Sequence, residues 1–280
     1  MTYKIIGDSC TDLTEELKKD SHIQLIPLTL QVDNIQIVDD ETFNQKKFLK
    51  LVKDSPECPK TACPSPERYK EAFECEADHI FVITLSEHLS GSYNSAMLAK
   101  RLYEEEHGEN EKNIAVFSSD SASSGQVNLA LFIKELCEKE QPFEEIVKRT
   151  LRYRDSMRTY FVLESLDTLR KNGRLTGLQA FFATALNIKP IMGADHGVII
   201  KLDQARGINK ALVKMCEIIH KEVKNPEEKR LVIAHCNNAP RAELVRKELL
   251  KRGKYREILI TETAGVASLY ANDGGIIIAV

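Results

Sequence analysis

Several features that would assign this chain to a known class of protein are missing from its sequence. No apolar run approaches the ~18 residues that a membrane-spanning helix needs, so we expect no integral membrane segment. The patterns GxSxG, GxGxxG, GxxxxGK[ST] and HExxH do not occur, so no motif indicates a hydrolase, dinucleotide, nucleotide or zinc-protease site. The net charge is −3 with both signs interspersed, so we expect no broad basic face and no nucleic-acid partner.

Cysteine is too irregularly placed to build a disulfide framework. The seven cysteines are odd in number and unevenly spaced, which indicates a reducing compartment. Cys58 and Cys63 have four residues between them, but no second pair follows at zinc-site spacing, so we expect no metal and no cofactor. The first residues, MTYKIIGDSCTDL, read as a strand and a polar turn rather than a signal peptide. We therefore expect a cytoplasmic protein.

The composition that is present is that of a globular α/β protein. Hydrophobic residues make up 42% of the chain and charged residues 29%, and the length of 280 residues suits one large or two ordinary domains. Short apolar runs alternate with amphipathic stretches along the whole chain. We predict two α/β domains: residues 1–156, with a parallel sheet flanked by helices, and residues 157–280, with a mixed sheet.

Residues 80–99, IFVITLSEHLSGSYNSAMLA, are the most informative stretch. The run 80–85 predicts a buried strand, residues 86–92 are small and polar, and a helical pattern begins at Tyr93. Such a turn places serine hydroxyls and free backbone N–H groups at a helix N-terminus, where α/β proteins commonly bind anions. The alternative is an ordinary cap, in which Ser90 or Ser92 satisfies its own helix.

The same arrangement recurs in the first half of the chain. A strand at 3–6 leads into the polar turn 7–12, and a strand at 114–117 leads into the hydroxyl-rich turn 118–125. The proline-rich segment 55–66 predicts a stiff loop without strand or helix. This loop either aims the Thr61 hydroxyl or leaves it in solvent. Several such turns at one sheet edge would form a cleft lined with hydrogen-bond donors.

Further elements are predicted from their patterns. Residues 13–19 read as a helix, residues 23–32 as a single strand in which Pro27 favours an edge or bulge, and residues 193–197 as the turn of a hairpin. Residues 175–186 are apolar with helical spacing, and residues 261–266 read as a polar turn.

A series of short motifs follows in order along the chain. They are Asp8-Ser9, Thr61-x-x-Pro64-Ser65-Pro66, Leu89-Ser90-Gly91-Ser92-Tyr93, Ala122-Ser123-x-Gly125, Leu169-x-x-x-Gly173-Arg174 and Asn187-Ile188-Lys189-Pro190-Ile191, followed by Arg206 and Lys210-Ala211. Each motif is weak alone. Together, from residue 3 to about 280, they resemble the DegV family.

The resemblance implies a non-catalytic carrier of long-chain fatty acids. It implies two α/β domains with the ligand cleft at their interface, and in some bacteria a separate fatty-acid kinase that acts on the carried ligand. By the matching motifs, Thr61 and Ser90 contact the carboxylate, and the backbone amides near Gly91 and Ser92 assist. Arg174 is expected near the cleft mouth, where it bears on the kinase.

The sequence departs from the family pattern in two places. Ala62 and Cys63 stand where the family commonly has Ser and Gln, and Glu262 stands where it commonly has a carboxylate-contacting His. Glu262 is thus a candidate ligand-binding position. Because an ionised Glu repels an ionised fatty acid, either one of the two holds a proton or Glu262 points away.

Two other functions fit the same residues. Ser90 with His88 or Glu262 could form a serine-dependent ester hydrolase, and the polar turns could bind another small anion, such as a phosphorylated metabolite. A fatty-acid site needs an apolar tunnel, since at ~0.8 kcal/mol per buried CH₂ a C16 chain gains on the order of 10 kcal/mol. Residues 80–82, 161–163 and 181–186 either line such a tunnel or belong to the hydrophobic core.

Overall fold

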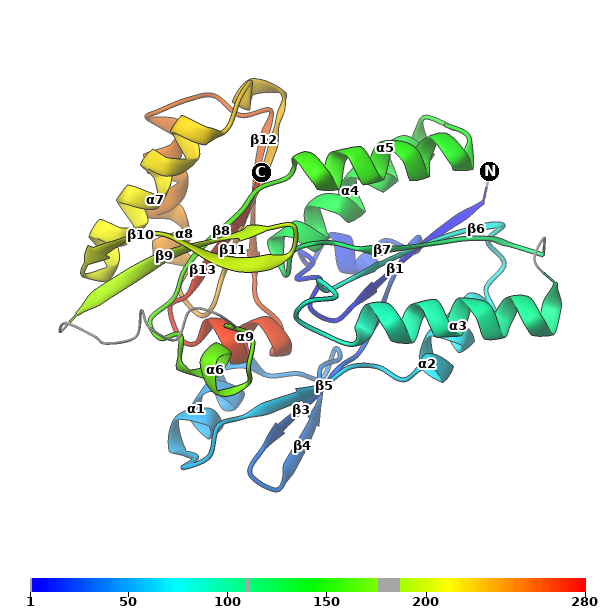
Figure 1. Ribbon diagram of the computed structural model, residues 1–280, viewed down its shortest axis with the longest axis horizontal. Coiled ribbons are helices and arrows are strands. Elements are labelled where there is room, and N and C mark those ends of the chain that lie inside the picture. Colours follow the sequence, from blue (N-terminus) through cyan, green and yellow to red (C-terminus); the bar gives the residue numbers. More distant parts are fainter. Residues whose placement is uncertain (1, 109–110, 176–186) are drawn as a thin grey trace.

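The computed structural model describes residues 2–108, 111–175 and 187–280, and these residues form three β-sheets with helices packed around them (Figure 1). In the described part of the chain, no helix is both long and apolar enough to cross a membrane. The predicted α/β class, with a parallel sheet followed by a mixed sheet, is confirmed.

The first sheet is entirely parallel and has the strand order β2-β1-β6-β7. Its strands are β1 (Tyr3–Asp8), β2 (Ile23–Ile26), β6 (His79–Thr84) and β7 (Asn113–Ser118). The flanking helices are α2 (Pro66–Phe73), α3 (Ser92–His107), α4 (Ser124–Glu138) and α5 (Phe143–Ser156). Ile80 and Val82 pack on one face with α2 and α3, whereas Phe81 and Ile83 pack on the other with α4. Both faces of β6 are therefore buried, which explains its continuous apolar run.

The second sheet is mixed and has the order β10-β9-β8-β13-β11-β12. Its strands are β8 (Thr159–Val162), β9 (Ile188–Asp195), β10 (Val198–Arg206), β11 (Arg230–His235), β12 (Glu257–Glu262) and β13 (Ile276–Ala279). Helices α7 (Ile208–Glu222) and α8 (Ala239–Leu250) cover one face, and the short 3₁₀ turn η3 is Pro226–Glu228. On the opposite face, Val127 of α4 packs against Val232 of β11. Helix α4 therefore lies between the two large sheets (Figure 1).

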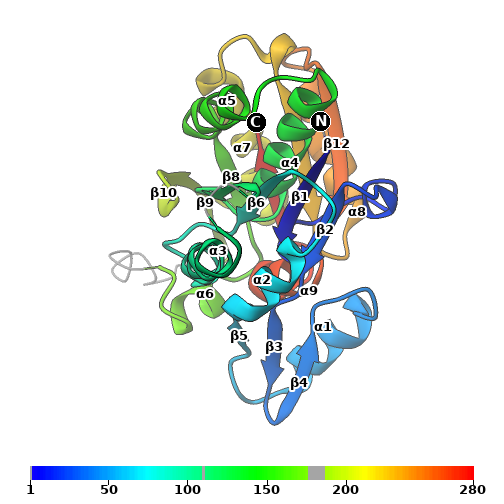
Figure 2. The same cartoon turned by 90° about the vertical axis from the view of Figure 1, so that its right-hand side faces the viewer.

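The third sheet is small and antiparallel, with the order β4-β3-β5. It consists of β3 (Thr29–Val32), β4 (Ile35–Val38) and β5 (Lys60–Ala62), and it lies beside α1 (Gln45–Asp54) and α9 (Gly265–Ala271). Figure 2 shows this unit projecting from one end of the molecule. No local pattern in the sequence predicts this sheet.

Several local predictions were wrong. The expected single strand 23–32 is two strands in different sheets, because the chain turns at Pro27 and Leu28 between β2 and β3. The proline-rich loop contains β5, which pairs with β3 through Leu30 and Thr61. Residues 13–19 form only the 3₁₀ turn η1 (Leu17–Lys19), and the turn 261–266 leads directly into α9. The predicted helix 175–186 lies outside the described residues except for Leu175.

The buried side chain of Asp39, which follows the small sheet, forms hydrogen bonds with the first residues of α9. Asp39 accepts hydrogen bonds from the backbone N–H groups of Gly265 (2.6 Å) and Val266 (2.9 Å), and from the Ser9 hydroxyl (2.8 Å). Asp39 approaches Gly265 so closely that a Cβ atom would collide with it, which explains the glycine. Residues 265–271 thus pack on the N-terminal half, and the domain boundary at 156/157 remains a prediction.

We expect Asp39→Ala to lower the free energy of unfolding by about 2 kcal/mol, because two buried N–H groups and one hydroxyl lose their acceptor. Glu41→Ala, which removes an exposed carboxylate two residues away, is the control and should change it by less than about 0.5 kcal/mol. Chemical denaturation monitored by circular dichroism measures both. Equal effects from the two variants would contradict the role assigned to Asp39.

Candidate functional site

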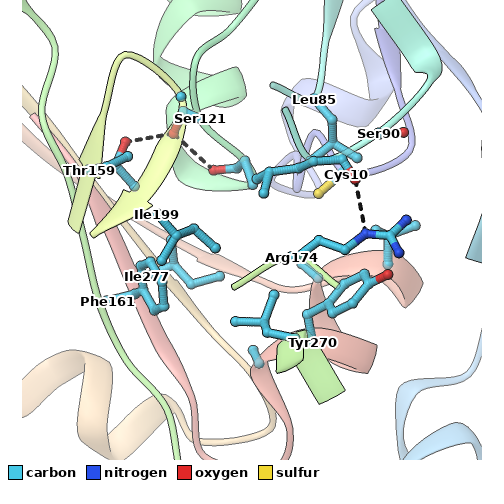
Figure 3. A pocket seen from close by; sticks show the side chains of 18 of the residues that line it. Cys10, Leu85, Ser90, Ser121, Thr159, Phe161, Arg174, Ile199, Tyr270 and Ile277 are labelled. Carbon is cyan, nitrogen blue, oxygen red and sulfur yellow. Dashed lines mark hydrogen bonds between the residues drawn. The ribbon is translucent and has the colours of Figure 1, made fainter. Parts of the chain in front are cut away.

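A narrow cavity lies between the turns that follow the strands of the parallel sheet, the mixed sheet and α9 (Figure 3). The space that the centre of a water molecule can reach inside it is about 90 Å³. Most of its lining side chains are apolar: Leu28, Leu85, Leu89, Phe161, Leu163, Leu169, Ile199, Val266 and Ile277, with several alanines. The cavity is therefore suited to an extended aliphatic group rather than to a compact polar metabolite.

The walls follow from strand periodicity. Phe161 of β8 and Ile277 of β13 are paired neighbours in the mixed sheet and point away from α7 and α8, into the cavity. The expectation that residues 161–163 contribute to the wall agrees with the lining, since Phe161 and Leu163 both belong to it. Residues 80–82 instead lie in the cores of the parallel sheet, and residues 181–186 lie outside the described residues.

Polar side chains gather at one end of the cavity, which we call the mouth. We define it by Ser90, Arg174 and Tyr270 (Figure 3) and by Thr61, which lies beside Tyr270. The Thr61 Oγ1 and Tyr270 Oη atoms are 3.1 Å apart, and the Ser90 Oγ lies 3.0 Å from the Ser92 Oγ. Strand β5 positions Thr61, the turn before α3 positions Ser90, and α9 positions Tyr270. Residues from three distant parts of the chain therefore meet at the mouth.

The turn before α3 presents an amide as well as a hydroxyl. Gly91 is the N-cap of this 16-residue helix, and among the described residues its backbone N–H has no hydrogen-bond partner. A Cβ at Gly91 would lie 3.1 Å from the Cys63 Sγ, so the turn is tightly packed against the loop that follows Thr61. A free N–H at a helix N-terminus favours an anion, although the binding role of Gly91 remains a prediction.

Ser92 forms hydrogen bonds with Ser90 within this turn and does not line the cavity. Its side chain is buried, and its backbone N–H donates to the Ser90 Oγ over 3.2 Å. Asp8 lies beneath the same turn, where it accepts from the Leu85 N–H (2.7 Å) and the Gln126 amide (2.7 Å). Burial raises the pKa of Asp8 to about 6.

Arg174 reaches the mouth from the segment after α6 (Asp167–Lys171). Its Nε donates to the Leu89 carbonyl over 3.2 Å, and its guanidinium also binds the Asn172 carbonyl. Arg174 thus lines the end of the cavity that holds Thr61 and Ser90, and its role at a cleft mouth and toward a kinase remains a prediction. Because part of the guanidinium is already bound to carbonyl groups, the mouth is lined by neutral donors and one partly engaged cation.

Glu262 is not at the mouth. It is exposed at the end of β12, where it lines a separate, broader groove together with Asp12 and His235. Burial lowers the pKa of His235, and the nearby Glu262 carboxylate opposes that shift. The geometry does not place Glu262 beside Thr61 and Ser90, and it matches the alternative in which this side chain points away. A direct carboxylate contact by Glu262 is therefore unsupported.

Comparison with known proteins identifies the family of this chain. The model of the family described as "Uncharacterised protein, DegV family" matches residues 2–280. The chain belongs to the DegV family. A DegV domain-containing protein of Streptococcus gordonii is 34% identical over 282 residues, covering 99% of this chain and 98% of that one.

Two solved DegV structures are close to this one. A Ruminococcus gnavus protein, refined with vaccenic acid, is 48% identical and superposes with a TM-score of 0.97 over 100% of both chains. The Streptococcus pneumoniae Fatty Acid Kinase (Fak) B3 protein, loaded with linoleic acid, is 32% identical with a TM-score of 0.90, covering 100% of this chain and 99% of that one.

Tyr270 is the mouth residue of this DegV protein that the sequence analysis missed. It belongs to α9, which has only seven residues and begins within the segment 261–266 that we predict as a polar turn. The pattern Val266, Ala267, Tyr270, Ala271 has the i, i+1, i+4, i+5 spacing of one helical face, and all four residues line the cavity. That spacing was the available signal.

The described contacts offer no catalytic pair at Ser90. Its side chain is paired with the hydroxyl and backbone of Ser92, rather than with His88 or Glu262. Nor do the described residues contain a group of three or more His, Cys, Asp or Glu side chains that could hold a metal ion. The serine-hydrolase alternative therefore has no geometric support in this part of the chain.

The protonation state of Asp12, which lines the separate groove with Glu262, can be tested through the pH dependence of stability. Asp12 is buried, its carboxylate accepts from the Ala264 N–H (2.6 Å) and the Ser123 hydroxyl, and burial raises its pKa to about 8. The folded protein thus retains a proton that the unfolded chain releases near pH 4. Between pH 6.5 and 8 the free energy of unfolding should fall by about 1 kcal/mol per pH unit.

Asp12→Asn should flatten this dependence, because the amide oxygen still accepts from Ala264 but does not titrate. Asp20→Asn serves as control: the pKa of Asp20 is lowered to about 2, so its titration lies well below the range measured. Urea unfolding at several pH values gives the slopes. An unchanged slope in Asp12→Asn would show that Asp12 is ionised in the folded protein.

Proposed function

We propose that this DegV protein binds a single long-chain fatty acid, with the carboxylate at the mouth and the acyl chain in the cavity. The observation that carries the proposal is the combination of a narrow apolar channel with uncharged donors at one end. Thr61 and Ser90, which line the cavity, would supply the hydroxyls, and the adjacent Gly91, which does not line it, would supply a backbone N–H. The vaccenic and linoleic acids named with the two solved relatives support the same ligand class.

The energetics of such a site divide into two parts. The tail contributes most of the affinity, since each CH₂ removed from water contributes ~0.8 kcal/mol. The head needs only a few hydrogen bonds, because a carboxylate that loses water must find donors or it is not buried at all. Neutral donors at Thr61, Ser90 and Gly91 meet that need without a fixed ion pair.

We further propose that the protein performs no chemistry of its own and presents the bound acid to a kinase in the cytoplasm. The name of the Streptococcus pneumoniae relative supports a link with a fatty acid kinase. A carboxylate bound at the open end of the channel, rather than at its closed end, would remain within reach of a second protein. Arg174, whose side chain borders that opening, is the proposed residue near the partner.

Thr61→Val and Ser90→Ala should each weaken the binding of hexadecanoic acid about five- to tenfold, because each removes one hydrogen bond to a charged group. Thr42→Val, which changes an exposed threonine remote from the cavity lining, is the control and should leave the affinity unchanged. Displacement of a fluorescent fatty acid measures all three. Wild-type affinity in both mouth variants would refute the proposed position of the carboxylate.

Tyr270→Phe should weaken binding by a smaller factor, about two- to threefold. In the proposed arrangement Tyr270 donates to Thr61, which in turn donates to the ligand, so the tyrosine orients the donor without contacting the acid. The double variant Tyr270→Phe with Thr61→Val should then bind no more weakly than Thr61→Val alone. Additive losses in the same displacement assay would indicate instead that Tyr270 contacts the carboxylate itself.

A further inference from the structure

The end of the cavity opposite the mouth is not purely apolar. Ser121 and Thr159 both line the cavity there, with 3% and 8% of their surfaces exposed, and their Oγ and Oγ1 atoms are 2.7 Å apart (Figure 3). Burying hydroxyl groups against an aliphatic chain is unfavourable unless they find partners. Two such groups at the far end of a fatty-acid channel therefore need an explanation.

The position of Ser121 is built into the surrounding turn. The Ser86 N–H donates to the Ser121 carbonyl (2.9 Å), and the Ser121 N–H donates to the Ser119 Oγ (3.2 Å), which together fix the backbone. A Cβ atom at Gly125 would collide with the Ser121 side chain, so the glycine makes room for it. Thr159 is the first residue of β8 and is held by the mixed sheet.

The two hydroxyls retain hydrogen-bonding capacity. The two hydroxyls carry one proton each. One of these protons forms the hydrogen bond between the two oxygens. The only described acceptor for the other is the Ala122 carbonyl, which lies 3.4 Å from the Ser121 Oγ. If Ser121 donates to Ala122, Thr159 donates to Ser121. The Thr159 Oγ1 then receives no hydrogen bond from any described residue.

The charged group nearest this end is already paired. Asp120 also lines the cavity, but its carboxylate lies 3.4 Å from the Arg154 Nε and accepts from the Ser118 hydroxyl (3.1 Å) in a small adjoining polar pocket. A group that reaches the end of the channel therefore meets neutral hydroxyls rather than a free charge. That environment suits a hydroxyl better than a second carboxylate.

We propose that the far end of this cavity binds a hydroxyl group carried by the acyl chain, so that the ligands include long-chain fatty acids hydroxylated at or near their methyl end. The inference rests on the proposed function. The ligand hydroxyl donates to the Thr159 Oγ1 and accepts from the Ser121 hydroxyl, whose proton leaves its long contact with the Ala122 carbonyl while Thr159 still donates to Ser121.

The test compares the dissociation constant of hexadecanoic acid with those of hexadecanoic acids hydroxylated at carbon 12, 14 or 16, by isothermal titration calorimetry. In the wild-type protein at least one hydroxy acid should bind at least as tightly as hexadecanoic acid. Its preference, expressed as the ratio of the two constants, should fall about tenfold in Ser121→Ala and in Thr159→Val. Thr159→Ser keeps a hydroxyl and should retain the preference.

Thr61→Val is the matched control, since it should weaken both acids alike and leave the ratio unchanged. Weaker binding of every hydroxy acid by the wild-type protein would overturn the inference, as would an unchanged ratio in Ser121→Ala and Thr159→Val. In that case the hydrogen bond between Ser121 and Thr159 serves only to hold the turn before α4 against β8. Failure of hexadecanoic acid itself to bind would instead overturn the proposed function, so the two outcomes are distinguishable.

Discussion

Three buried carboxylates that accept backbone hydrogen bonds determine how the site is assembled. Asp8 binds the Leu85 N–H, Asp12 binds the Ala264 N–H, and Asp39 binds the N–H groups of Gly265 and Val266. None forms an ion pair with a described residue, and burial raises the pKa of each of them. Each therefore serves as an acceptor for a turn that would otherwise leave N–H groups buried without partners.

These contacts explain why residues remote in sequence meet at the mouth. Asp8 fixes the segment that leads to Ser90, while Asp12 and Asp39 fix the beginning of α9, which carries Tyr270. Thr61 is positioned by the pairing of β5 with β3, which belongs to the same small sheet unit as α9. The mouth thus depends on hydrogen bonds between loops more than on any one element of regular structure.

The large sheets could be predicted from the sequence because their signals are local. The apolar run of β6 and the hairpin of β9 and β10 were both recognisable, and the resemblance to the DegV family identified Thr61 and Ser90, which the structure brings to one cavity. The small sheet could not be predicted, because β5 has three residues and is stabilised by pairing with β3 across the proline-rich loop. Local preference gives no signal for a strand whose stability comes from a distant partner.

The direction of the Glu262 side chain also depends on tertiary packing. At the end of β12, the direction of a side chain depends on which face of the strand is covered, and here Thr261 and Thr263 are buried whereas Glu262 is exposed. The alternation along TET places the glutamate on the face opposite to its neighbours. A motif comparison identifies the position but not the face, so it left open whether Glu262 contacts the carboxylate or points away, and the strand directs this side chain into another groove.

A channel lined by the mixed sheet and by the turns that follow the parallel strands also couples binding to the contacts between these turns and that sheet. The Ser86 hydroxyl donates to the Gly197 carbonyl at the tip of the β9–β10 hairpin (2.9 Å), and Ser121 meets Thr159 on β8. Separating these contacts would expose the whole acyl chain to water at a cost of ~0.8 kcal/mol per CH₂. In the proposed complex a bound acid would therefore stabilise these contacts, and chain length would set how strongly it does so. Release to the proposed partner would then be driven at the mouth, where a few neutral hydrogen bonds would bind the head group and the opposing free energy would be smallest.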